Sequence, residues 1–185
     1  MPSDREAEDP TREQQHSPQW DFIVSLYAEP DIRDACLALQ NMGGIDIPIL
    51  LAALYASAKQ NIRFEIQDIR EMDVLVDPLR KNYVLPLRAM RTAPKREAVP
   101  NANSGLGELR TKILEAELLA EREQLALLDL YISRKCPQAA GGSNPTDTLK
   151  RVCDFYFARA NIDESTARNI APSLEILSKA ILSGK

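Results

Sequence analysis

Residues 106–135 read LGELRTKILEAELLAEREQLALLDLYISRK, a stretch with no proline and no glycine beyond Gly107. Its apolar residues recur at intervals of three and four, which is the spacing of one face of an α-helix. We therefore expect a single helix near 106–135, about 45 Å long at 1.5 Å per residue. The seam that this helix is expected to bury consists of Leu114, Leu118, Leu125, Leu128 and Ile132.

The same helical spacing recurs along the rest of the chain. Residues 49–56 are apolar on nearly all faces, which is typical of a central, buried helix, and their alanine content argues against a strand. Asp46 is the expected N-cap of that helix. Pro78 and Pro86 should kink or divide a helical stretch at 65–93, because each removes a helix hydrogen bond. We predict an all-α fold, an irregular helical bundle of about seven helices.

Caps and prolines predict the ends of the remaining helices. Ser17 and Pro18 begin the first one, and Asn41-Met42-Gly43-Gly44 ends the second. Thr146 or Asp147 should cap the penultimate helix and Asp163 the last one. We expect Pro172 to bend or split the last helix.

The expected division of the chain has three parts. Residues 1–17 are acidic and polar with almost no apolar residue, so we expect a disordered tail. Residues 18–136 form the helical core domain. Residues 146–185 form a two-helix extension that packs on the core.

Composition excludes several classes of protein. The formal net charge of −4 gives no general attraction to nucleic acid or to an anionic membrane. No apolar run approaches the roughly 20 residues of a membrane span, so we expect no membrane partner. The three cysteines are odd in number and widely spaced, which favours reduced thiols and a cytoplasmic location.

The sequence contains no recognisable set of catalytic residues. The single histidine, His16, lies in the expected tail, where nothing could hold a catalytic group in place. This argues against Ser-His-Asp and Cys-His triads and against histidine-rich zinc sites. Cys36 and Cys153 fall on apolar helix faces, as core thiols do. We predict no catalytic residue, and the sequence favours a protein that is not an enzyme.

A basic cluster is the most patterned charge feature. Between residues 80 and 96 there are six cations and no acid, and Arg88, Arg91 and Lys95 share one helical stripe. Three interpretations remain open: a solvated helix face, a surface for an acidic protein partner or for the acidic tail, and nucleic acid, which the lack of interleaved aromatics disfavours. The candidate partner-binding residues are Arg80, Lys81, Arg88, Arg91, Lys95 and Arg96.

Two pairs of carboxylates raise a second possibility. Asp73 and Asp77 stand one helical turn apart, and so do Glu117 and Glu121. Facing each other across a bundle, the four could bind Mg²⁺ or Mn²⁺. Solvated helix faces give the same spacing by chance. Glu121 also occupies the vacant turn of the leucine seam, where a buried carboxylate would need a cation, such as an arginine of the preceding helix.

Several segments together carry a resemblance to a known family. These segments are Trp20-Asp21-Phe22, Leu26-Tyr27, Ala35 to Gln40, Gly44 to Ile47, Leu50-Leu51, Val84 to Arg88, Arg91, Leu114 to Glu117, and Glu121-Arg122. Over roughly residues 18–135 the chain resembles an uncharacterised family of small all-helical proteobacterial proteins, a domain of unknown function. The resemblance implies a helical bacterial protein and carries no activity. Among the matched polar residues, Gln40 and Asp46 are expected to be structural.

Two functions follow as hypotheses. The first is a non-catalytic cytoplasmic helical protein, a protein-interaction or regulatory module with an unidentified protein partner and no cofactor. The alternative is a helical enzyme or metal-binding protein that uses Asp73, Asp77, Glu117 and Glu121. Helices at 146–185 could form a homodimer face under either hypothesis.

Overall fold

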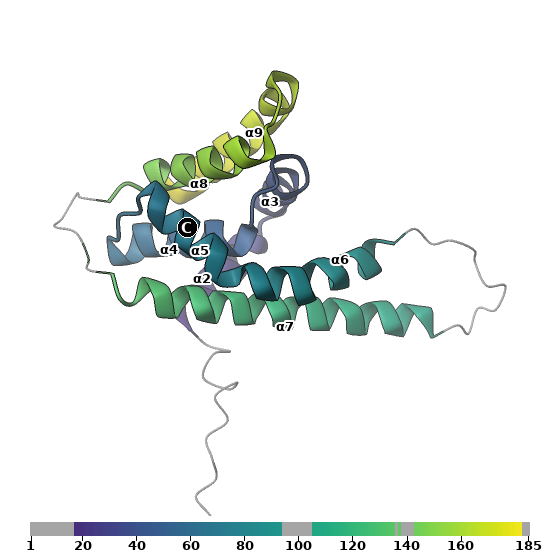
Figure 1. Ribbon diagram of the computed structural model, residues 1–185. Helices are drawn as coiled ribbons and strands as arrows, with labels where there is room; N and C mark the ends of the chain where they lie inside the picture. The colour runs from purple at the N-terminus through teal and green to yellow at the C-terminus, as the bar shows by residue number, and fades with distance from the viewer. Residues whose placement is uncertain (1–16, 94–104, 136, 138–142, 183–185) are drawn as a thin grey trace, which may run out of the picture. The chain divides into compact units, whose positions relative to one another are not determined.

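The computed structural model describes residues 17–93, 105–135, 137 and 143–182. Among these residues all regular structure is helical, so the predicted all-α class is confirmed (Figure 1). The chain forms two compact units, one from residues 1–64 and 137–185, the other from residues 65–136. These units do not follow the boundaries expected from the sequence, because the C-terminal helices group with residues before 65. The expected tail at 1–17 lies almost entirely outside the described residues.

The first unit contains helices α2 (Pro18–Tyr27), α3 (Pro30–Gly43), α4 (Ile47–Gln60), α8 (Pro145–Ala160) and α9 (Glu164–Leu182). Helix α4 carries the core, since Ile49, Leu50 and Leu54 are fully buried. The predicted central helix is therefore confirmed. Helix α8 packs on α4, and α9 packs along α3.

Local capping explains where these helices begin and end. The Asp46 carboxylate accepts a hydrogen bond from the Ile49 backbone N–H at 3.1 Å, and Ser17 and Asp163 cap α2 and α9 in the same way. Gly44, at a φ of 65°, ends α3 in the left-handed conformation that glycine adopts without strain. The cap of α8 is Asn144 rather than the predicted Thr146 or Asp147. Pro172 lies inside α9 without splitting it, so that part of the prediction was wrong.

The second unit contains α5 (Ile66–Leu79), a π-helical turn η2 (Arg80–Val84), α6 (Leu85–Thr92) and the long α7 (Leu106–Ile132). Pro78 and Pro86 lie on either side of the π-helical turn. The stretch at 65–93 therefore stays helical from Ile66 to Thr92 and changes helix type between its two prolines. Helices α5 and α6 both pack on α7. Figure 1 shows α6, in dark teal, running beside the green N-terminal half of α7.

The buried face of α7 differs from the predicted leucine seam. Leu125, Leu128 and Ile132 are buried as expected, but Leu114 and Leu118 are 40% and 45% exposed. The positions buried in their place are Glu117, Ala120 and Gln124. Two of these three residues are polar, which is why apolar spacing pointed to the wrong face.

None of the helices in the described ranges combines the length and the apolar character that crossing a membrane requires.

Candidate functional site

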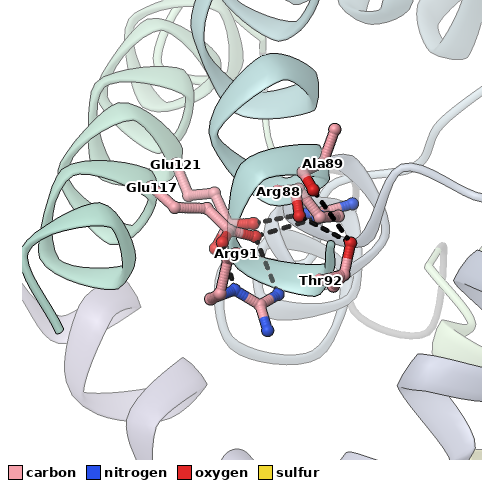
Figure 2. A network of polar contacts seen from close by, with 6 residues as sticks. All are labelled: Arg88, Ala89, Arg91, Thr92, Glu117 and Glu121. Carbon is pink, nitrogen blue, oxygen red and sulfur yellow. Dashed lines mark hydrogen bonds and ion pairs between the residues drawn. The ribbon is translucent and has the colours of Figure 1, made fainter. Parts of the chain in front are cut away.

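An ionic network joins α6 to α7 (Figure 2). Arg88 donates through Nε to Glu117 at 2.9 Å and through Nη2 to Glu121. Arg91 donates through both Nε and Nη2 to the same Glu117 carboxylate, at Oε2 and Oε1. Glu117 is only 3% exposed, so its charge is balanced inside the protein by two guanidinium groups. We call these four residues the ionic quartet.

Helical spacing brings the quartet together. Arg88 and Arg91 are three residues apart, and Glu117 and Glu121 are four apart, so each pair lies on one helix face. The partner number on α7 falls from 121 to 117 as the number on α6 rises from 88 to 91. The two helices are therefore antiparallel, and their facing surfaces meet in a layer of charges.

The electrostatics of the quartet depend on Glu117. Burial alone would raise the pKa of Glu117, but the hydrogen bonds and charges of Arg91 and Arg88 outweigh it and lower the pKa below its ordinary value. The hydrogen bond to Glu117 in turn raises the pKa of Arg91. With two positive and two negative groups the quartet is neutral, and its ion pairs link α6 to α7.

A second ion-paired group lies where α5 meets η2. Arg80 donates to Asp73 and Asp77 at 2.7 Å each, and Lys81 pairs with Asp77 at 2.7 Å. Hydrogen bonds from Lys81 and then Arg80 lower the pKa of Asp77. Asp73 is buried, so the Arg80 pair supplies the counter-charge that a buried carboxylate needs.

These two groups answer the question that the sequence left open about the basic cluster. Arg88 and Arg91 pair internally with Glu117 and Glu121. Lys81, although more than half exposed, also contacts a carboxylate of its own chain. Lys95 and Arg96 lie outside the described residues. The cations predicted to bind a partner are thus engaged in holding the second unit together wherever the structure describes them.

The four candidate metal ligands fall into the same two groups. Asp73 and Asp77 form ion pairs with Arg80. Glu117 and Glu121 instead form ion pairs with the arginines of α6. Within the described ranges, no three or more His, Cys, Asp or Glu side chains lie close enough together to hold a metal ion. The predicted meeting of the two carboxylate pairs therefore does not occur there.

The remaining residues singled out by sequence have structural surroundings. Asp46 caps α4, as expected, and Gln40 lies half-buried on α3. Cys36 and Cys153 are free thiols in the core, and burial raises the pKa of each to about 12. A thiol with so high a pKa carries almost no thiolate near neutral pH, so neither cysteine is an activated nucleophile.

Sequence reasoning missed a third polar group, between α5 and α7. The Tyr131 hydroxyl donates to Glu71 at 2.8 Å and lies 3.3 Å from Oδ1 of Asp68, which Lys135 also binds. Burial and the hydrogen bond to Glu71 raise the pKa of Tyr131, so it remains a neutral donor. The only signal in the sequence was the spacing of four between Tyr131 and Lys135.

The other missed feature is an exposed apolar surface on the α6–α7 hairpin. The Arg88–Glu121 pair marks one side of this hairpin. Leu85 lies three residues before Arg88 and Leu118 three before Glu121, so both leucines lie on that side. Leu114 lies one turn before Leu118. All three are at least 40% exposed, and we call them the leucine face.

Comparison with known proteins places the chain in a family. No curated protein and no solved structure matches it. A family model described as a protein of unknown function (DUF2390) matches residues 18–128, which is more than half of the chain. That range includes the ionic quartet, Asp46 and the leucine face. The chain belongs to the DUF2390 family of proteins of unknown function.

Proposed function

We propose that this protein is a non-catalytic, cytoplasmic helical module that binds another protein chain through the leucine face. The observation that carries the proposal is the exposure of Leu85, Leu114 and Leu118 on one side of the α6–α7 hairpin. Single exposed leucines are ordinary, but apolar residues that gather on one helix side are a feature of interaction surfaces.

The interior of the hairpin supports this role. A helix pair normally points its leucines at its partner helix and its charges at water. Here α7 points Glu117 at α6 and leaves Leu114 and Leu118 exposed. Because buried charges cost desolvation energy, such a reversal is expected where the exposed leucines have a contact of their own to make.

The non-catalytic and cytoplasmic parts of the proposal have separate support. Cys36 and Cys153 are buried and unactivated, and the described arginine and carboxylate pairs neutralise each other. Free buried thiols suit a reducing compartment.

Affinity capture from the cells that produce the protein tests the proposal. The tagged chain is compared with a Leu114→Ser/Leu118→Ser variant. The control is Leu119→Ser/Leu130→Ser, which changes two leucines of the same helix that are at least as exposed but point about 100–160° away from Leu114 and Leu118. We expect a stoichiometric protein to be recovered with the wild type and the control and to be lost with the first variant. Equal recovery with all three proteins would refute the role of the leucine face.

Thermal melting with millimolar Mg²⁺ or Mn²⁺ tests the alternative of a carboxylate–metal protein. A metal that binds the native state would raise the melting temperature. We expect no shift, because guanidinium groups already bind one carboxylate oxygen of Asp73 and both carboxylate oxygens of Glu117. A rise that is abolished by Glu117→Gln would overturn the non-catalytic assignment in favour of the metal hypothesis.

A further inference from the structure

We propose that the partner at the leucine face is a second copy of this chain, packed antiparallel about a twofold axis that passes close to Leu118. This inference rests on the proposed interaction function and identifies the occupant of that surface.

The first argument is the continuity of the apolar stripe along α7. Leu114, Leu118, Leu125 and Ile132 follow one another at helical spacing on one side of the helix. Leu125 and Ile132 are buried, whereas Leu114 and Leu118 are exposed. A second α7 laid across the exposed half would complete the stripe, and two α6–α7 hairpins would then form a four-helix arrangement with leucine between them.

The second argument is the order of charges beside the stripe. Glu115 precedes Leu118 by three residues, and Arg122 follows it by four. In an antiparallel pair centred on Leu118, Glu115 of one copy therefore lies near Arg122 of the other, at both ends of the contact. The aliphatic stem of Arg122 would also cover Leu114 of the opposite copy. A parallel pair would instead set Glu115 against Glu115, which repels.

Sedimentation equilibrium of the full-length chain, up to about 100 μM, tests the inference. We expect a dimer for the wild type and for the Leu119→Ser/Leu130→Ser control. Leu114→Ser/Leu118→Ser removes four leucines from the contact, so its dissociation constant should rise about a hundredfold or more. A wild type that stays monomeric, or equal dimerisation of all three proteins, would overturn the inference.

Charge exchange tests the antiparallel geometry without depending on the leucines. Glu115→Arg and Arg122→Glu should each weaken the dimer, because each places like charges together at both ends of the contact. The double variant should restore dimerisation, since it exchanges the two partners. Circular dichroism melting of the two single variants shows whether the monomer remains folded. Two weak single variants with no restoration in the double variant would refute the antiparallel pairing.

The two proposals fail in different ways. A monomeric chain that captures a different protein, and loses it on Leu114→Ser/Leu118→Ser, would refute the dimer and keep the interaction function. A dimer that is insensitive to both leucine substitutions, with no captured protein, would refute both.

Discussion

Glu117 carries the sharpest prediction about stability. We consider Glu117→Gln, which keeps the shape of the side chain and removes its charge. In the native protein this carboxylate receives hydrogen bonds from Arg88 and twice from Arg91, and it is nearly inaccessible to water. The substitution therefore leaves two guanidinium groups without the anion that balances them.

The magnitude follows from how much each partner can recover. Removing one member of a fully buried ion pair costs about 3–5 kcal/mol. The side chains of Arg88 and Arg91 are 20% and 33% exposed, so water can solvate them in part, and Arg88 retains Glu121. The amide oxygen of glutamine also accepts one hydrogen bond. We therefore expect Glu117→Gln to lower the free energy of unfolding by about 2 kcal/mol.

Urea denaturation followed by circular dichroism at pH 7 measures this loss. Glu123→Gln is the matched control, because Glu123 lies on the same helix, is exposed and belongs neither to the quartet nor to the proposed contact between copies. Its effect should stay within about 0.5 kcal/mol. If Glu117→Gln destabilises the protein no more than Glu123→Gln does, the quartet does not hold α6 on α7 and the reasoning is wrong.

Three further predictions test other parts of the structure. The folded-state pKa of Glu117 is lowered, so its contribution to the free energy of unfolding is complete above the unfolded pKa of about 4.3 and disappears as pH falls through the folded value. In urea titrations the stabilities of the wild type and Glu117→Gln should therefore converge in acid. A stability difference that widens in acid would contradict this prediction. Gly43→Ala places a Cβ at 2.6 Å from Cε1 of Phe157, so it should destabilise the protein by about 1–2 kcal/mol in thermal melts. The control Gly107→Ala, whose added Cβ has no neighbour within 4 Å, should cause no loss of stability. Equal stability of the two variants would argue against the close contact at Gly43. The buried Gln124 amide has no hydrogen-bond partner among the described residues. Gln124→Met should therefore raise the free energy of unfolding by about 1 kcal/mol or more in urea titrations. A clear loss of stability would show that the amide has a hydrogen-bond partner.

Local chemistry made much of the fold predictable from the sequence. Ser17, Asp46 and Asp163 cap helices through contacts within three residues of themselves, so their roles can be inferred without knowing the tertiary structure. Gly44 ends α3 for the same local reason. Pro172 was expected to bend or split the last helix, but α9 packs along α3 and continues past the proline without a break.

The candidate site could be predicted only in part. Arg88, Arg91, Glu117 and Glu121 were all identified from spacing, and so was the possibility that they pair. The sequence did not show which carboxylate is buried, because the buried face of α7 includes polar residues and apolar spacing therefore does not mark it. Glu121 filled a gap in the leucine seam, yet Glu117 is the more deeply buried. The facing surface of α7 is set by the packing of α6, a separate helix, and no pattern within α7 contains that information.

The quartet and the leucine face have complementary effects on the hairpin. Apolar side chains between two helices tolerate small slips in register, because many packings bury similar areas. Bidentate arginine–carboxylate hydrogen bonds do not tolerate such slips, since their geometry is satisfied at one register only. The quartet therefore fixes α6 on α7 at the position where Leu85 of α6 shares a side with Leu114 and Leu118 of α7. A shift by one turn would separate Arg88 from Glu121 and misalign the leucines together, so the charge layer maintains the surface that we propose for association.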